Sequence, residues 1–250
     1  MKISIVTATW NSKATILDCL DSVASQSHPG TEHVVIDGAS TDGTLGLLEA
    51  RRGQLGLLLS EPDRGIYDAL NKGLARATGD VVGFLHSDDV FAGPDVLAAV
   101  AQAFERDPQL GAVYGDLDYV RQHDISQVVR QWRSAPFSPG DLEWGWMPPH
   151  PTLYVRRQWY ERIGGFDVNY RISADYFSVL SLFRSPGFYA AHLPMVMVKM
   201  RLGGISNRSI RTLVRKSRED WDALRRSGFG VCEGARALAW KNIGKLYQFV

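Results

Sequence analysis

The chain has 250 residues and a net charge of +1, and its 45% hydrophobic and 22% charged residues are ordinary for a soluble globular protein. No apolar run approaches the roughly 18 residues that cross a bilayer, and the first residues lack the apolar core of a signal peptide. The two cysteines, Cys19 and Cys232, show neither a metal-binding spacing nor a disulfide framework. These features favour a protein of the reducing cytoplasm.

The charge is unevenly distributed along the chain. Residues 201–250 hold eleven Lys/Arg and four Asp/Glu, whereas residues 1–200 hold seventeen and twenty-three. An acidic body suggests a cation site, and the basic C-terminal segment suggests contact with an anionic surface such as a membrane. A solvated helical face is the alternative explanation of the basic segment.

The first half of the chain predicts strands that alternate with helices. Runs rich in β-branched residues predict strands at residues 3–8, 33–37, 57–59, 81–85 and 112–114. Helices are predicted from a cap at Asn11 or Ser12 through Val23, from 41 to 52, from 66 to 77 and from 94 to 106. This alternation indicates an α/β fold with a mostly parallel sheet wound by crossover helices.

The pattern loosens after about residue 116. Residues 128–132 predict a strand, and residues 136–151 predict a loop over a site because they are rich in Pro, Gly and Trp. Further helices are predicted at 158–163, 174–183 and 210–226. A division near residue 116 is expected to separate two halves of one domain.

Polar residues follow four of the predicted strands. They are Thr9, Asp37, residues 61–64 and the pair Asp88-Asp89. Sheets of this kind bind ligands beyond the carboxyl ends of their strands, so we expect the four groups on one rim. Two carboxylates after a buried strand suit a divalent cation such as Mg²⁺ or Mn²⁺. Acids that merely begin a helix are the alternative explanation of the pair.

Short motifs along the chain resemble those of family 2 glycosyltransferases, including bacterial exopolysaccharide and colanic-acid enzymes. They lie at residues 4–11, 35–44, 61–73, 84–89, 150–151, 164–167 and 173–176. The resemblance covers roughly residues 3–205 and implies a GT-A fold and inverting transfer from a nucleotide-sugar. It implies one domain over 1–205, with a nucleotide-sugar-binding half at 1–116 and a smaller, mixed acceptor half at 117–205. Residues 206–250 are then a basic, helical C-terminal extension.

The resemblance also implies roles for residues on the donor side. Asp89 is expected to bind Mn²⁺ or Mg²⁺, Asp88 to contact the ribose or the sugar, and Asp37 to accept a hydrogen bond from the nucleobase. The other donor-binding residues expected are Thr7, Thr9, Trp10, Asp63, Arg64, Asn71 and Lys72. Each has a plain structural alternative, as a strand residue, a turn former, a surface ion pair or the polar face of a helix.

On the acceptor side, Asp175 is the expected catalytic base. Inverting transfer needs a carboxylate that takes the proton of the acceptor hydroxyl. The family places this base near the start of a helix, and residues 172–175 fit, although a carboxylate there also favours the helix dipole. His150 and Trp146 are expected to line the acceptor side. Trp144 and Trp159 are further candidates for stacking on sugar rings, with core positions as the alternative.

The chain departs from the common pattern of the family at five positions. Gly38 stands where a second acid is common, and Ala174 stands where Glu often precedes the base. The other departures are Trp10 in place of Tyr, His86 in place of Asn, and Ser87 before the acidic pair instead of a strict Asp-x-Asp. None of them removes Asp37, Asp89 or Asp175.

The expected activity is metal-dependent, inverting transfer of a hexosyl group from a UDP- or GDP-sugar to a saccharide or lipid-linked acceptor. Bacterial surface polysaccharide or glycolipid synthesis in the cytoplasm, at the inner face of the membrane, is the expected setting. A catalytically inactive nucleotide-sugar-binding scaffold and a nucleotidyltransferase are the alternatives. Residues 7–11 lack the Gly of a phosphate loop, which disfavours the latter. No nucleic-acid recognition motif accompanies the basic segment, so no nucleic-acid partner is expected.

Overall fold

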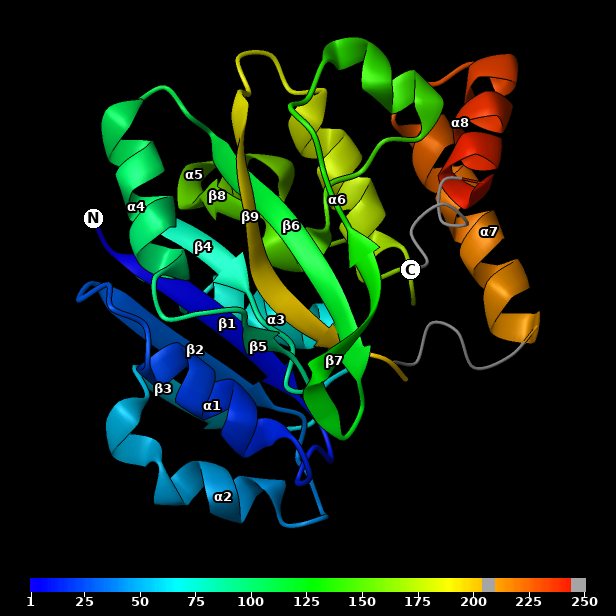
Figure 1. Ribbon diagram of the computed structural model, residues 1–250. Coiled ribbons are helices and arrows are strands. Elements are labelled where there is room, and N and C mark those ends of the chain that lie inside the picture. The colour runs from blue at the N-terminus through cyan, green and yellow to red at the C-terminus, as the bar shows by residue number, and fades with distance from the viewer. Residues whose placement is uncertain (204–209, 244–250) are drawn as a thin grey trace.

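The computed structural model describes residues 1–203 and 210–243 (Figure 1). Within this part of the chain, nine strands form one sheet in the order β3-β2-β1-β4-β8-β6-β9-β5, with β7 paired to β6. The strands are β1 (Ile3–Thr9), β2 (Thr31–Asp37), β3 (Leu57–Ser60), β4 (Val81–Phe84), β5 (Val90–Phe91), β6 (Ala112–Arg121), β7 (Asp124–Trp132), β8 (Tyr154–Arg156) and β9 (Ala190–Arg201).

Helices cover both faces of this sheet. The α-helices are α1 (Ile16–Ala24), α2 (Thr44–Ala50), α3 (Ile66–Leu74), α4 (Val96–Arg106), α5 (Arg157–Ile163), α6 (Ala174–Phe183), α7 (Ile210–Arg226) and α8 (Val231–Ile243). Three short 3-10 helices are η1 (Arg52–Gln54), η2 (Pro139–Trp144) and η3 (His150–Thr152). No helix in the ranges 1–203 and 210–243 is long and apolar enough to cross a bilayer.

The first four strands build the parallel half of the sheet. β1 pairs in parallel with both β2 and β4, and β2 pairs in parallel with β3. Their register places Thr9 beside Asp37 and Asp37 beside Ser60, so the polar ends of three strands meet on one rim. The second half is mixed, because β8 runs antiparallel to β4 and β6 while β9 runs parallel to β6. The predicted α/β fold with a mixed second half is therefore confirmed.

The core follows from the alternation of side chains along the strands. In β1, Ile3 and Ile5 pack with α1 and α4, whereas Val6 and Ala8 face the opposite side, where α3, α5 and α6 lie (Figure 1). Each buried Val, Leu or Ile contributes roughly 1.5–3 kcal/mol relative to an exposed one. The rim that carries the polar strand ends is thus set on a rigid, well-packed base.

The C-terminal helices share this core. Ala223 and Leu224 of α7, Phe229 between the helices, and Ala237 of α8 are buried in the same cluster as Val6 and Tyr176. These helices lie on the right of Figure 1, against α6 and η2. Residues 206–209 and 244–250 of the predicted extension lie outside the described residues. The described remainder of that extension packs as an integral part of the molecule.

All seven predicted helices are present, and the structure adds α8 and the strands β5, β8 and β9. The predicted cap of α1 is wrong, because the helix begins at Ile16 and neither Asn11 nor Ser12 caps it. Asn11 has a φ of 50°, and its Oδ1 instead accepts a hydrogen bond from Thr41 N at 2.9 Å. This contact ties the loop after β1 to the loop after β2.

Candidate active site

Asp37 orders the rim at the end of β2. Its side chain is fully buried, with Oδ1 accepting a hydrogen bond from Ser40 Oγ at 2.5 Å. Its Oδ2 accepts hydrogen bonds from Ser60 Oγ at 2.6 Å and from Ser40 N at 3.1 Å. Both oxygens are thus committed to the loops after β2 and β3. A direct bond from Asp37 to a nucleobase stays a prediction, and it would require the base to share or displace one of these serine contacts.

An accessible corner lies beside Asp37. A Cβ atom added at Gly38 would lie 2.6 Å from Asp63 Oδ2 and 3.4 Å from Trp10 Cδ1, so only glycine lets these groups approach. The Trp10 side chain is 64% exposed, which leaves its ring face open to a planar ligand. Asp63 is held in place because its Oδ1 accepts a hydrogen bond from Gly65 N at 2.8 Å. The carboxylate missing at Gly38 is replaced in space by that of Asp63.

The loop that carries Asp63 is supported by Lys72. Its Nζ donates to the Pro62 carbonyl at 2.8 Å and pairs with Glu61 at 3.0 Å. Arg64 is largely exposed and pairs with Asp68 at 3.1 Å. Lys72 therefore fixes the loop of residues 61–64 to α3, while the Arg64 side chain lies at the surface. The donor-binding roles of Lys72 and Arg64 stay predictions.

Two of the predicted donor-binding residues, Thr7 and Asn71, have partners within the protein. Thr7 is fully buried, and its hydroxyl lies 2.9 Å from His33 Nε2 inside the sheet. Asn71 donates from Nδ2 to Phe166 O at 2.7 Å and accepts from Phe166 N at 2.9 Å, so its amide fastens the loop after α5. Thr9 stands at the rim itself, nearly buried, with its hydroxyl lacking a hydrogen-bond partner among the described residues.

The two carboxylates after β4 differ sharply in accessibility. Asp89 is fully buried; its Oδ1 accepts a hydrogen bond from Arg201 N at 3.1 Å, and its Oδ2 is buried without a partner among the described residues. Burial, followed by the charge of Asp88, raises the pKa of Asp89 well above its usual range. Asp88 is only half-buried. The metal contact of Asp89 stays a prediction: its Oδ2 has no partner among the described residues, whereas Asp88 is the carboxylate that is partly open to solvent.

Asp175 stands in the first turn of α6, with 23% of its side chain exposed. Its Oδ2 lies 3.3 Å from His150 Nδ1. The Tyr67 hydroxyl lies 3.2 Å from Oδ1 and 2.5 Å from the Ile172 carbonyl. The carboxylate is therefore reachable from solvent and held from two sides, by η3 and by α3.

His150 joins Asp175 to the loop that follows β4. The rings of His150 and His86 lie 5.7 Å apart, and His86 belongs to the same loop as Asp88. Burial lowers the pKa of His150 to about 4, with smaller contributions from Lys216 and Lys241, although Asp175 opposes the shift. Its Nδ1 lies beside the Asp175 carboxylate, and the lowered pKa disfavours the protonated form that a full ion pair would need.

The loops after β1 and β4 also touch. Ser12 Oγ lies 2.9 Å from Ser87 Oγ, and Ser12 N donates to Thr44 Oγ1 at 2.9 Å. The Trp10 corner, the Asp88 loop and the Asp175 carboxylate are thus connected through direct contacts. Residues from six separate segments of the sequence converge on one side of the sheet.

The sequence did not reveal that α7 supports the start of α6. Glu219 Oε2 accepts hydrogen bonds from the backbone N–H groups of Ile172 at 2.8 Å and Ser173 at 3.0 Å, and Arg171 N lies 3.2 Å from the same carboxylate. Backbone N–H groups at the start of a helix have no hydrogen-bond acceptor within the helix. The Glu219 carboxylate supplies one and so fixes the turn that leads to Asp175. The only signal was an acidic pair, Glu219-Asp220, within a basic segment.

A buried charge cluster lies beside the same turn. Asp220 pairs with Lys216 at 2.7 Å and with Lys241 of α8 at 3.1 Å. The Lys241 ammonium lies 3.0 Å from the centre of the Tyr176 ring, a cation–π contact next to Asp175. Burial lowers the pKa of Lys241 to about 7, although Asp220 opposes the shift. The basic extension therefore contributes charges to the interior of the site as well as to the surface.

The predicted aromatic residues separate into two groups. Trp159 is buried against Phe188, with ring centroids 5.1 Å apart, so it belongs to the core. Trp146 is half-buried and packs on Tyr114 and Phe183, while Trp144 is 52% exposed beside α8. The stacking roles of Trp144 and Trp146 stay predictions, whereas Trp159 has the core position that was the alternative.

Comparison with known proteins agrees with this architecture. The profile described as "Glycosyl transferase family 2" matches residues 4–166. An uncharacterized glycosyltransferase of Mycobacterium tuberculosis is 33% identical over 69% of this chain, a match that spans 65% of that protein. The PGL/p-HBAD biosynthesis glycosyltransferase of Mycobacterium bovis is 32% identical over 82% of this chain and 78% of its own length.

Two solved structures share the fold at low identity. S. aureus TarS 1-349 in complex with UDP-GlcNAc is 20% identical over 97% of this chain and 72% of its own, with a TM-score of 0.70. The mannosyltransferase PcManGT from Pyrobaculum calidifontis, in complex with GDP-Man and Mn²⁺, is 23% identical over 96% of this chain and 68% of its own, with a TM-score of 0.65. These likenesses confirm the GT-A fold. With the profile match and the mycobacterial relatives, they show that the chain belongs to glycosyl transferase family 2.

Proposed function

We propose that this chain transfers a hexosyl group from a nucleoside-diphosphate sugar to an acceptor hydroxyl with inversion at the anomeric carbon. The observation that carries the proposal is the accessible Asp175 carboxylate, which His150 and Tyr67 hold in contact with the loop of Asp88. A base and a leaving-group site on adjoining loops are what a single in-line displacement requires.

The donor nucleotide fits the corner formed by Trp10, Gly38 and Asp63. The exposed Trp10 ring offers a stacking face, and Asp63 offers an acceptor for the N–H groups of a base. Asp37 acts indirectly in this proposal. It holds the loop of Ser40, against which the nucleobase would lie. The fold relatives that bind UDP-GlcNAc and GDP-Man support a nucleotide-sugar at this rim.

A divalent cation fits Asp88. No group of three or more His, Cys, Asp or Glu within residues 1–203 and 210–243 is arranged to hold an ion alone. One half-buried carboxylate at the end of β4 nevertheless suits a cation that takes its other ligands from a diphosphate and water. We therefore assign Mn²⁺ or Mg²⁺ to Asp88, and we assign to Asp89 the task of fixing this loop to Arg201. When bound, the cation supplies Lewis-acid stabilisation of the leaving diphosphate.

Asp175 performs the proton transfer in this proposal. Its carboxylate takes the proton of the acceptor hydroxyl while that oxygen bonds to the anomeric carbon and the bond to the diphosphate oxygen breaks. His150, whose Nδ1 lies 3.3 Å from Oδ2, stands beside the carboxylate and limits its orientation. A general base of this kind contributes about 10²–10⁴-fold to the rate.

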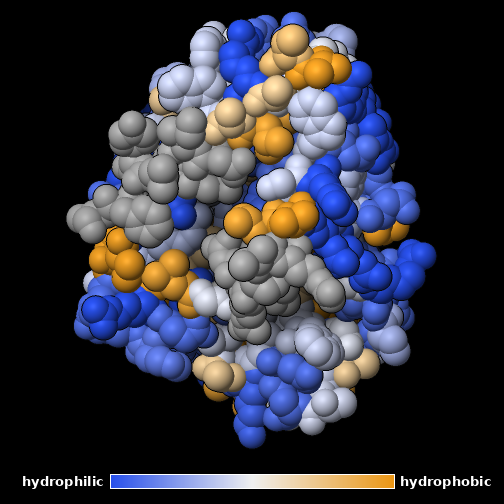
Figure 2. All heavy atoms as spheres, turned by 90° about the vertical axis from the view of Figure 1, so that its right-hand side faces the viewer, coloured by the Kyte–Doolittle hydropathy of each residue, from blue (hydrophilic) through white to orange (hydrophobic). Residues whose placement is uncertain are grey.

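The setting that we propose is synthesis of bacterial surface polysaccharide or glycolipid in the cytoplasm, with a saccharide or lipid-linked acceptor. The glycolipid-type name of the Mycobacterium bovis relative supports it. The surface over α7 and α8 is hydrophilic with separate hydrophobic patches (Figure 2). Leu213 and Val214, exposed beside Arg215, give α7 both an apolar and a basic component for contact with an anionic membrane.

The test combines donor binding with product stereochemistry. A thermal-shift screen of UDP-, GDP- and dTDP-sugars with Mn²⁺ should find a donor that raises the melting temperature, because a ligand that binds only the folded state stabilises it. NMR of the product formed from that donor should show the opposite anomeric configuration. Retention of configuration, or the absence of binding by every donor, would reject the proposal.

A further inference from the structure

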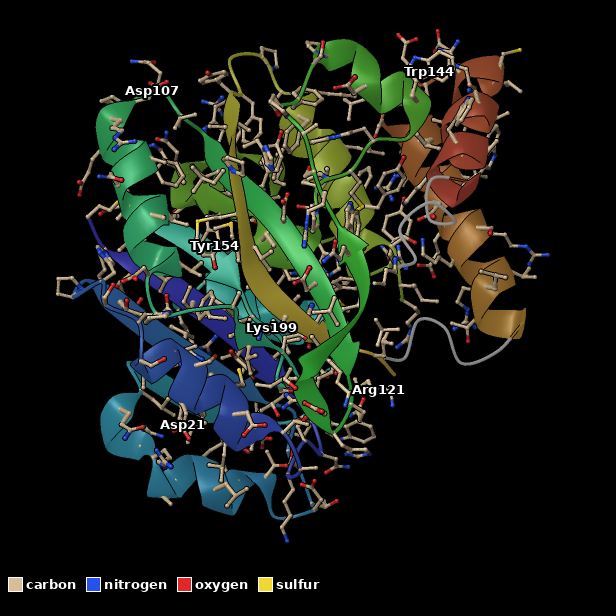
Figure 3. The ribbon with its side chains drawn as sticks, viewed as in Figure 1. Asp21, Asp107, Arg121, Trp144, Tyr154 and Lys199 are labelled. Carbon is tan, nitrogen blue, oxygen red and sulfur yellow. The ribbon has the colours of Figure 1, made fainter. Side chains whose placement is uncertain are left out.

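A pocket of about 420 Å³ opens between the end of β7, η2 and α8. This volume lies in the range of roughly 300–1,000 Å³ that is typical of small-molecule sites. In Figure 3, Trp144 marks the place where η2 meets α8. The lining residues that matter below are Arg133, Asp141, Trp144, Trp146, Trp240 and Lys241.

Two half-exposed tryptophans stand at this pocket. Trp144 is 52% exposed and Trp240 is 46% exposed, and their ring centroids lie 5.7 Å apart in an edge-to-face arrangement. The Arg236 guanidinium covers the Trp144 ring at 4.7 Å and pairs with Glu143 at 2.5 Å, which holds the ring in position. Adjacent apolar rings that remain in contact with water are typical of binding surfaces.

The wall behind these rings is rigid. Trp146 packs on Tyr114 and Phe137, with centroid distances of 5.5 and 4.8 Å. Gly145 has a φ of 69°, and a side chain at this position would collide with the Ala237 carbonyl of α8. The loop and the helix therefore meet backbone to backbone, and the pocket is preformed without an ordering step on binding.

Charged groups accompany the aromatic walls. Arg133 is fixed by its ion pair with Asp118 at 2.7 Å, and Asp141 is fixed because its Oδ2 accepts a hydrogen bond from Ser138 N at 2.7 Å. Lys241 is fixed by Asp220 at 3.1 Å. Flat apolar faces with charged groups at their edge suit a sugar ring, which has C–H groups on its faces and hydroxyls around its rim.

Two of the residues that line the pocket connect it with the proposed catalytic site. Trp146 leads through residues 147–149 directly to His150, which contacts Asp175. On the opposite side, Lys241 lines the pocket while its ammonium lies over the Tyr176 ring, one residue from Asp175. A ligand in the pocket would therefore lie next to the segments that carry His150 and Asp175. α8, which forms one wall of the pocket, lies outside residues 4–166, which match the family profile.

We propose that the pocket between η2 and α8 binds a sugar ring of the acceptor, which lies against Trp144 and Trp240 with its hydroxyls toward Arg133 and Asp141. The proposal deepens the glycosyltransferase function proposed above and rests on it. An alkyl chain is the poorer occupant, because it would displace water from the charged edge of the pocket and offer Arg133 and Asp141 no hydrogen bond in its place.

Saturation-transfer difference NMR on the full chain tests this inference with methyl glycosides of the common hexoses and deoxyhexoses. We expect at least one to bind through its ring protons, and Trp240→Ala and Trp144→Ala to weaken it about tenfold each. Trp240→Phe should retain part of the affinity because it keeps a flat ring. Tyr189→Ala removes an aromatic side chain that is 54% exposed and absent from the pocket lining, and it serves as the control.

Glycoside binding and donor binding are measured separately, so failure of the pocket proposal can be told from failure of the proposed function. If no methyl glycoside binds, or if both tryptophan variants bind it like the wild type, the pocket is not an acceptor site. Stronger binding of octyl glycosides through their alkyl protons alone would also overturn it, in favour of a lipid tail. Donor binding is followed in parallel by thermal shift in each variant. Its failure in the wild type would reject the glycosyltransferase proposal itself.

Discussion

The carboxylate of Asp175 and the imidazole of His150 lie 3.3 Å apart. Burial lowers the pKa of the histidine to about 4, although Asp175 opposes the shift, so the pair has little ion-pair character near neutral pH. A protonated neighbour would hold the oxygen of the proposed base in an ion pair. An uncharged neighbour leaves that oxygen more able to take a proton.

We expect Asp175→Asn to lower turnover by at least about 10²-fold while donor affinity stays near that of the wild type. The amide keeps the shape of the side chain but cannot take the acceptor proton. Turnover at saturating donor and calorimetric titration of the donor measure the two quantities. Asp21→Asn, at an exposed carboxylate paired with Arg51, is the matched control. Weakened donor binding with normal turnover would show that Asp175 acts on the donor instead.

We expect the same Asp→Asn change to affect the Mn²⁺ requirement strongly at Asp88 and little at Asp89. Asp88→Asn should raise the Mn²⁺ concentration needed for half-maximal activity by at least about tenfold, because it removes the accessible carboxylate. Asp89→Asn should alter that concentration little, since the buried amide can still accept the hydrogen bond from Arg201 N through its oxygen. Metal titrations after EDTA treatment make the comparison. A stronger metal effect at Asp89 than at Asp88 would restore the assignment that the sequence first suggested.

Glu219→Gln should lower turnover by roughly three- to tenfold and stability by about 1–3 kcal/mol. The neutral side chain weakens the bonds to the amides that precede α6, so Asp175 is held less firmly. Donor affinity should remain unchanged, which separates a positioning role from general damage. Glu161→Gln is the control, because Glu161 is exposed and pairs only with Arg157 on its own helix. Normal turnover in Glu219→Gln would show that α7 does not position the base.

Stability should fall as the pH decreases from about 6.5 to about 4. Burial lowers the pKa of both His33 and His150 to about 4, whereas histidine in an unfolded chain titrates near 6.5. Within this window the unfolded state binds more protons than the folded state, so the free energy of unfolding decreases as acid is added. Urea titrations at several pH values measure it. His33→Gln and His150→Gln should each flatten the dependence, and an unchanged slope in both would contradict the expectation.

Membrane contact by α7 is tested without deleting it, because truncation would remove Glu219 and the buried Leu224. The double change Leu213→Ser and Val214→Ser should reduce flotation with vesicles that contain anionic lipid, since it removes exposed apolar surface beside basic residues. Vesicles of neutral lipid provide the reference, and catalytic activity toward a soluble acceptor should stay constant. Equal flotation of both proteins would count against this surface.

The parallel half of the fold was predictable from sequence because its strands are short, apolar and rich in β-branched residues. The shared edge of Thr9, Asp37 and Asp88 was predictable, because parallel sheets bind ligands beyond the carboxyl ends of their strands. The solvent accessibility of the side chains on this edge was not predictable. Asp89 is buried by Arg201, which lies 112 positions further along the chain, and no local pattern shows such a contact.

Contacts between residues that are distant in sequence also explain why the second half of the chain was harder to predict. β9 contains Pro194 and lacks clean alternation, so neither the strand nor its parallel pairing with β6 was predicted. Thr7 and Asn71 carry polar groups at suitable positions, yet His33 and the Phe166 backbone satisfy them. Glu219 falls in a segment whose net charge suggested a solvated surface. In each case the partner lies far away in sequence, and only the folded chain brings the pair together.

The backbone-to-backbone fit of Gly145 against α8 has a consequence for engineering. Because the loop and the helix leave no room for adjustment at this seam, neither can be exchanged alone with the corresponding piece of a relative. A chimera that aims at a new acceptor would have to transplant the two segments together, and it would have to keep Glu219 so that the graft does not misalign the base. If the pocket selects the acceptor as proposed, a change of acceptor requires η2, α7 and α8 to be exchanged together.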